Sequence, residues 1–219
     1  MKVLLITILL AAAMHAETFT YWIEPCSRPE AECESGDVQL AEWALNAWEK
    51  ASGGNVTFVK SRLSRARIRL YWASSGNRGL YGEARPITVD DQPGAELAIR
   101  PDLHALGHKI EGEGTRDRLF RHSIVYLTCL HEAGHALGLA HTKSSADIMY
   151  SFEYGGNILE YFNRYRRKLK TREDIQLFSG LSAEDEKRLA ALYRNRTAKN
   201  PAAPSAMPAA SSAPIKDNQ

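Results

Sequence analysis

Residues 131–141 read HEAGHALGLAH, which places three histidines at spacings that suit one metal ion. On a helix, His131 and His135 are four residues apart and lie on the same face. Gly138 follows where a helix commonly ends in a left-handed residue, which lets the chain turn back and bring His141 to the same point. Three neutral imidazoles bind Zn²⁺ and leave its fourth position open for water, the arrangement of a catalytic rather than a structural zinc site.

Glu132 directly follows the first of these histidines, so its carboxylate can reach that water without binding the metal. Zn²⁺ lowers the pKa of its water to about 7 and polarises a carbonyl group. A nearby carboxylate can take the proton of the attacking water and pass it to a leaving amine. The pattern therefore predicts hydrolysis of an amide bond, with Glu132 as general base and then general acid. His104, His108 and His122 share no motif spacing, and we expect them to be surface or loop residues.

The segment HEAGHALGLAH resembles the HExxHxxGxxH signature of the metzincins, zinc peptidases with a methionine in a turn beneath the metal. Met149, in ADIMYSFEY, fits that turn as a packing residue and not as a ligand. Thr142, the preceding IVYLTCL and the later GLSAEDEKRLAALY resemble the matrixin branch, that of the matrix metalloproteinase catalytic domains. Astacin-like and serralysin-like members place a zinc-binding tyrosine two residues after the methionine, where this sequence has Ser151.

The resemblance covers roughly residues 19–194 and implies an α+β fold. This metzincin-like zincin fold has a twisted, mostly parallel sheet, an active-site helix, a methionine turn and a C-terminal helix. The resemblance also implies one catalytic zinc, bound by the three histidines, and protein or peptide substrates. It further implies that ELAIRP (Glu96–Pro101) is the edge strand that pairs with an extended substrate. Tyr154 would line the specificity pocket.

The sequence also departs from the matrix metalloproteinases. Their propeptide cysteine blocks the zinc, whereas here the first predicted strand begins within a few residues of the predicted signal peptide, so we expect no latency by that route. The cluster of their structural zinc is not evident, so we expect one zinc. Asp90 and Asp91 could contribute to a Ca²⁺ site, but a solvated turn is the favoured interpretation. Gly155–Gly180 inserts a basic helical segment that either borders the cleft or covers the outside.

Periodicity and turn residues predict the elements that must position these side chains. Residues 102–115 are polar and are expected to form a loop. Strands are predicted at 19–25, 56–61, 66–73 and 96–101, and helices at 37–52, 116–137, 157–170 and in the segment LSAEDEKRLAALY, where Ser182 caps and Asp185 occupies the third position.

The two ends of the chain differ from the middle. Residues 1–16 have the layout of a signal peptide, with Lys2, an apolar run and cleavage after Ala13 or Ala16. The apolar run is shorter than the roughly 20 residues that span a bilayer; a retained membrane anchor is the alternative. Residues 17–196 form the predicted catalytic domain, and the Ala/Pro/Ser-rich residues 197–219 a disordered tail. We expect a secreted or periplasmic protein without stable membrane insertion after cleavage.

Composition limits the partners. The formal net charge of +2 gives no long-range attraction for an acidic partner. The basic runs 60–69 and 164–172 are interpreted as solvated faces, so we expect no binding of nucleic acid. We also expect a monomer. Cys26 and Cys33 bracket a short loop and are predicted to form a disulfide in an exported protein. Cys129 is predicted to be a core residue.

These observations favour a secreted zinc-dependent endopeptidase. The sequence does not reveal how its activity is restrained, and self-cleavage or a separate inhibitor protein would each be compatible with it. The leading alternative is a non-catalytic zinc-containing binding module of the same fold. Glu132 favours the enzyme, because metal binding alone gives no reason for a carboxylate at that position. A third hypothesis is a protein that binds anionic surfaces or nucleic acid through residues 164–172, which would require steep salt dependence.

Overall fold

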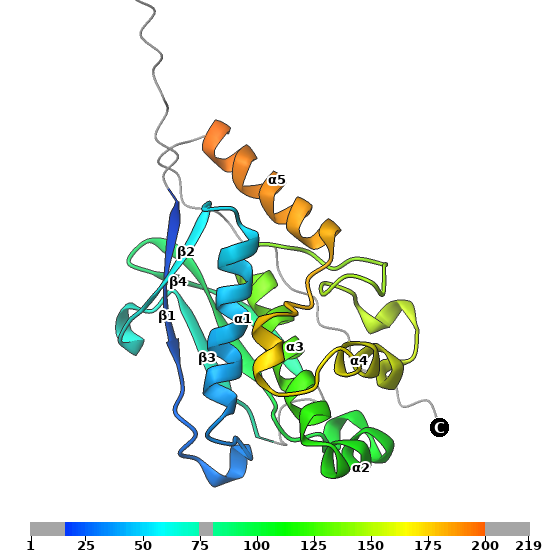
Figure 1. Ribbon diagram of the computed structural model, residues 1–219. Coiled ribbons are helices and arrows are strands. Elements are labelled where there is room, and N and C mark those ends of the chain that lie inside the picture. The colour runs from blue at the N-terminus through cyan, green and yellow to red at the C-terminus, as the bar shows by residue number, and fades with distance from the viewer. Residues whose placement is uncertain (1–15, 75–80, 200–219) are drawn as a thin grey trace, which may run out of the picture.

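The computed structural model describes residues 16–74 and 81–199 (Figure 1). The predicted signal peptide lies outside the described residues except for Ala16. The predicted tail also lies outside them, apart from residues 197–199, which belong to the last helix.

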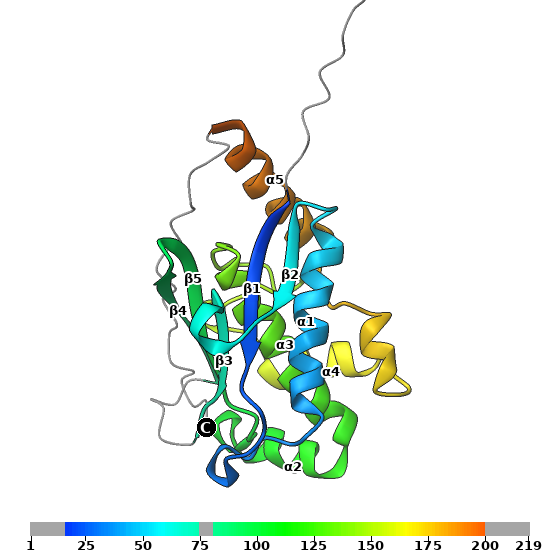
Figure 2. The same ribbon diagram turned by 90° about the vertical axis from the view of Figure 1, so that its left-hand side faces the viewer.

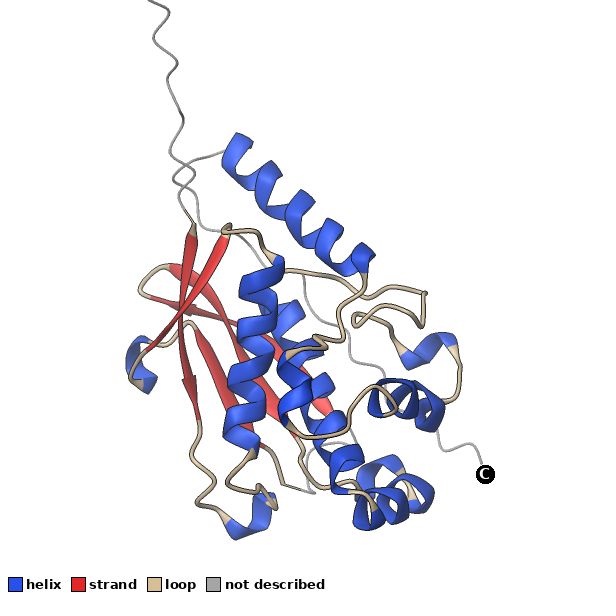
Figure 3. Cartoon of the chain, in the orientation of Figure 1, coloured by secondary structure: helices blue, strands red, loops and turns tan. Residues whose placement is uncertain are grey.

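A five-stranded sheet forms one layer of the molecule (Figure 3). The strand order is β2-β1-β3-β5-β4, and every pairing is parallel except that of β4 with β5. The mostly parallel sheet of the predicted α+β fold is therefore confirmed. The strands are β1 Glu17–Ile23, β2 Val56–Lys60, β3 Ile68–Trp72, β4 Gly82–Val89 and β5 Gln92–Ile99.

Helices α1 and α3 pack side by side against one face of this sheet (Figures 1 and 2). Trp48 of α1 is fully buried, and its indole N–H donates to the carbonyl of Leu130 on α3 at 2.8 Å. This contact joins the two helices behind the site. The helices are α1 Asp37–Ala51, α2 His108–Arg116, α3 Arg118–Ala136, α4 Ile158–Arg166 and α5 Ala183–Lys199.

The edge strand is β4, so the expectation that Glu96–Pro101 forms the edge is wrong. Most of that segment belongs to β5, which lies between β3 and β4. Asp90 and Asp91 form the turn between β4 and β5 with φ of 50° and 59°, as a two-residue hairpin turn requires. The sheet therefore ends in an antiparallel hairpin, and the aspartates act as turn residues.

Pro86 lies within β4 without breaking it, because its missing N–H would face away from the sheet. The N–H of Ala95, the partner of Pro86, donates to Arg67 at 2.7 Å on the β3 side. Backbone groups alternate direction along a strand, so the N–H and C=O groups of Gly82 and Ala84 and the C=O group of Pro86 point outward. Among the described residues no strand pairs with this edge, which therefore offers donors at Gly82 and Ala84 and none at Pro86.

Two further differences concern the approach to α3. The segment predicted as loop contains a single 3₁₀ turn, His104–Leu106, followed by α2. The helix predicted from residue 116 begins instead at Arg118, because Asp117 caps it and accepts from the N–H groups of Leu119 and Phe120 at 2.9 and 3.1 Å.

His122, expected at the surface or in a loop, is instead buried within α3. Three other local predictions are confirmed. Ser182 and Asp185 cap α5 reciprocally, with distances of 3.0 and 2.9 Å between each backbone N–H and the other side chain. Cys26 and Cys33 form a disulfide, and Cys129 is buried. Within the described residues, no helix is both long and apolar enough to cross a membrane.

Candidate metal centre

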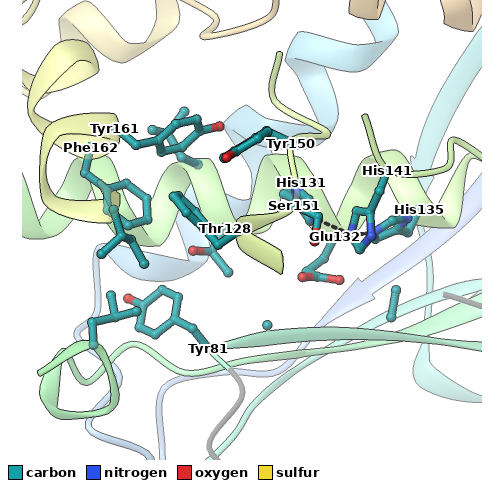
Figure 4. Close-up of a pocket in the computed structure, with 16 residues that line it drawn as sticks. Tyr81, Thr128, His131, Glu132, His135, His141, Tyr150, Ser151, Tyr161 and Phe162 are labelled. Carbon is teal, nitrogen blue, oxygen red and sulfur yellow. Dashed lines mark hydrogen bonds between the residues drawn. The ribbon is translucent and has the colours of Figure 1, made fainter. Parts of the chain in front are cut away.

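The C-terminal end of α3 and the turn after it bring three imidazoles together. His131 and His135 project from successive turns of α3. Gly138 follows with φ of 96°, its N–H donates to the carbonyl of His135 at 2.8 Å, and the chain reverses. His141 then faces the two helical histidines (Figure 4). The predicted use of Gly138 is confirmed.

The three side chains meet at their Nε2 atoms. His141 Nε2 lies 3.2 Å from His131 Nε2 and 3.0 Å from His135 Nε2. Tetrahedral Zn²⁺ with Zn–N bonds of about 2.0–2.1 Å places its nitrogen ligands about 3.3 Å apart. The spacing of these nitrogens therefore fits a single zinc ion.

Hydrogen bonds fix the ring tautomers in the form that binds a metal. His131 Nδ1 lies 2.7 Å from the carbonyl of Ile148, and His135 Nδ1 lies 2.8 Å from that of Leu139. A carbonyl only accepts, so each Nδ1 carries the hydrogen and each neutral ring directs a bare Nε2 at His141. A proton on His141 Nε2 could be donated to only one of these two Nε2 atoms, whereas a cation could bind the Nε2 atoms of all three histidines.

Burial keeps these rings neutral. It lowers the pKa of His131 to about 3, helped by the neighbouring imidazoles, and the pKa of His135 to about 4. The pKa of the less buried His141 is lowered as well. At neutral pH all three are therefore in the form that a metal ion requires.

Glu132 lies between α3 and the edge strand β4 (Figure 4) and is 6 % exposed. A Cβ atom on Gly82 of β4 would lie 2.5 Å from its Oε1, so a side chain at residue 82 would force the carboxylate to move. Burial raises the pKa of Glu132 to about 8, with a further contribution from Glu83. A divalent cation at the imidazoles would lower that pKa.

Met149 packs directly behind the histidines. It is fully buried, and a Cβ on Gly134 would collide with its sulfur. The carbonyl of the preceding residue, Ile148, accepts from His131. The turn thus supports a histidine from beneath, and Met149 lies where it could fill the packing role expected for it.

An apolar pocket opens beside the imidazoles (Figure 4). Strand β4 forms one wall, α3 forms the floor, and α4 of the inserted segment forms the opposite wall. The alternative in which this segment borders the cleft is therefore the correct one. Apolar lining residues are Leu106, Leu127, Ile158, Tyr161 and Phe162.

The turn after the methionine contributes Tyr150 and Phe152 to the pocket. The hydroxyl of Tyr150 donates to the carbonyl of Gly155 at 2.6 Å, which fixes the ring. Tyr154 is not among the residues that line the pocket. It is 48 % exposed, and the ammonium of Lys143 lies 5.4 Å above its ring.

The geometry agrees with a comparison of sequences. A sequence model of the matrixin family matches residues 13–161, more than half of the chain. The chain belongs to the matrixin family. No curated protein matches it. Matrixins are zinc-dependent metalloproteases, which establishes this function and a catalytic zinc at the level of the family. The match ends within α4, so α5 and most of the inserted segment lie outside it.

Sequence reasoning missed the contribution of β4. Gly82 and Ala84 both line the pocket, yet no strand was predicted at these residues. The alternation in EARPITV and the Asp-Asp pair after it were the available signals for a hairpin strand.

Proposed function

We propose that this matrixin is an exported endopeptidase that cleaves extended peptide segments at the His131–His135–His141 centre. The main observation in support is the buried Glu132 carboxylate directly beside three converging imidazoles, at the open edge of β4. A site that only stored metal would gain nothing from a buried carboxylate outside the ligand set, because burying it costs free energy.

In this proposal the three imidazoles are the zinc ligands. When bound there, Zn²⁺ supplies a Lewis acid for the scissile carbonyl and acidifies water. Glu132 accepts the proton of the attacking water and then delivers it to the leaving amine nitrogen. The bonds from His131 and His135 to backbone carbonyls hold the rings in place throughout. Met149 remains a packing residue.

The edge of β4 accounts for binding of the substrate backbone. The outward N–H and C=O groups of Gly82 and Ala84 can pair with an extended peptide. The side chain next to the scissile bond then enters the pocket between α3 and α4, where Leu127 and Phe162 favour an apolar residue. Pairing with the peptide backbone would end at Pro86, because this residue offers no outward donor.

Export is proposed from residues 1–16, whose pattern is that of a signal peptide. The Cys26–Cys33 disulfide supports this, because disulfides persist in oxidising compartments. We further propose that residues 17–196 form the catalytic unit and residues 197–219 a tail. The monomeric state and an inhibitor protein remain predictions.

The basic run 164–172 gives little support to the anionic-surface hypothesis. Arg166 bonds Asp117 at 2.7 Å, and Arg167 pairs with Glu160. Arg172 stacks over Trp43 at 4.6 Å and donates to a backbone carbonyl. Arg166 and Arg172 hold the inserted segment to the domain, and Arg167 pairs within the segment, so these guanidinium groups are engaged within the molecule.

Zinc content and cleavage measured together test the proposal. Protein beginning at Glu17 is compared with Glu132→Gln and with Glu186→Gln, a control on the exposed face of α5. We expect zinc in all three proteins and chelator-sensitive cleavage of casein in the parent and the control only. Cleavage by Glu132→Gln at the parent rate would refute the assigned chemistry. Zinc without cleavage in the parent would favour the binding module.

A further inference from the structure

A second group of metal-ligating side chains lies at the corner between β5 and α3. Glu111 Oε2 lies 3.3 Å from His104 Nδ1 and 3.4 Å from His108 Nδ1. One ligand atom from each residue lies within 4.8 Å of the other two. Apart from the histidines of the main centre, this is the one such group among residues 16–74 and 81–199.

The backbone at this corner holds the three side chains on one side. His104 opens the 3₁₀ turn, and its N–H donates to Asp102 at 3.1 Å. Asp102 is itself fixed by a buried pair with Arg100 at 3.1 Å. Gly107, with φ of 87°, then turns the chain so that α2 begins at His108. Glu111 lies three residues further, on the same face of α2.

We propose that His104, His108 and Glu111 bind a second divalent transition-metal ion, Zn²⁺ being the best match. Two imidazoles and one carboxylate are a common catalytic-type zinc ligand set, with the remaining position open to water. The side chains of the two histidines are 67 % and 91 % exposed, so the ion enters directly from solvent. Without an ion, an exposed His–Glu pair contributes little to stability, so stability alone does not explain the convergence.

The position of this corner gives the second ion a consequence for the pocket. Leu106, between the two histidines, is 9 % exposed and lines the apolar pocket beside the main centre. An ion that joins the 3₁₀ turn to α2 across Gly107 would fix the wall that Leu106 provides. Resting on the proposed peptidase function, this predicts that the second ion lowers KM for peptides and leaves kcat unchanged.

Metal stoichiometry tests the proposal independently of cleavage. Native mass spectrometry during a Zn²⁺ titration is applied to the parent, to His108→Ala and to Glu113→Gln. The last is a control on the same helix, whose carboxylate pairs with Arg116 outside the cluster. We expect two ions in the parent and the control and one in His108→Ala. Saturation of the parent at one ion would overturn the proposal, as would two ions in His108→Ala.

A second measurement distinguishes loss of the second ion from loss of the ion at the His131–His135–His141 centre. Protein preloaded with one equivalent of Zn²⁺ is titrated with Co²⁺, and visible absorbance is followed. We expect absorbance to saturate at one added equivalent in the parent and in Glu113→Gln, and to be absent in His108→Ala. Equal absorbance in His108→Ala would overturn the assignment. Circular dichroism should be alike in all three, because His108 is almost fully exposed.

Discussion

Gly82 on the edge strand lies directly against Glu132 on α3, with 2.5 Å between the position of a Cβ on Gly82 and Glu132 Oε1. The same Cβ would lie 2.8 Å from Cγ2 of the short side chain of Thr128. One residue therefore both presents its backbone at the open edge and leaves room for the proposed general base.

Gly82→Ala should reduce cleavage about 100-fold, because displacement of a catalytic group by about 1 Å can cost that much. Zinc content should be unchanged, since the three atoms nearest to this Cβ position belong to Glu132 and Thr128 and not to an imidazole. Single-turnover kinetics with metal analysis measures both. Gly112→Ala is the control, because a Cβ there meets only Arg116 at 3.7 Å. Parent-like turnover of Gly82→Ala would contradict the role given to this contact.

Asp185 should support zinc binding from a distance. Its buried carboxylate accepts from the N–H of Ile148 at 2.8 Å, and the carbonyl of Ile148 accepts from His131. Asp185→Ala should lower the free energy of unfolding by about 1–3 kcal/mol through loss of the cap and of a buried acceptor. Zinc affinity should fall about tenfold. Urea unfolding and chelator competition measure these effects, with the exposed Glu184→Ala as control. Unchanged zinc affinity in a folded Asp185→Ala would show that the turn holds His131 unaided.

Asp117 should make stability depend on pH in the acidic range. Partial burial raises the pKa of Asp117. The hydrogen bonds from Arg166 and from the N–H groups of Phe120 and Leu119 lower it by a larger amount, so the folded pKa lies below the ordinary 3.8. The stabilisation is complete above that ordinary value and is lost as pH falls through the folded pKa.

Asp117→Asn keeps a capping side chain and removes the charge. At pH 7 its free energy of unfolding should be about 1 kcal/mol below that of the parent. This difference should shrink as pH falls from 3.8 through the lower folded pKa, at which the carboxylate of the folded parent becomes protonated. Urea unfolding across this range gives the comparison. A difference that stays constant with pH would exclude the charge of Asp117 as its source.

Removal of zinc should destabilise the parent. An ion that binds only the folded chain adds about 2.7 kcal/mol at a concentration 100-fold above its Kd. A chelator should therefore lower Tm, and added Zn²⁺ should restore it. His135→Ala should show a much smaller response, since it lacks one of the three imidazoles. An equal response of parent and variant would mean that the stabilising ion binds elsewhere.

The metal centre was predictable because its determinants are local. Helical spacing fixes His131 and His135, and Gly138 permits the reversal that returns His141. The edge strand was not predictable in this way. Pro86 is tolerated only because its N–H position faces outward, which depends on pairing with Ala95. Glycine-rich α2 was missed for a similar reason, since Gly114 is required by close packing against Leu103.

Pro86 also bears on how this protein behaves at high concentration. An open strand edge tends to recruit strands from other copies, which leads to aggregation. Here the outward row of donors is interrupted after Ala84, and the side chain of Arg85 is exposed beside the interruption. A short peptide can still pair across Gly82 and Ala84, whereas a full-length strand from a second copy cannot complete its ladder. An edge of this kind favours pairing with a short peptide over pairing between two copies of the chain.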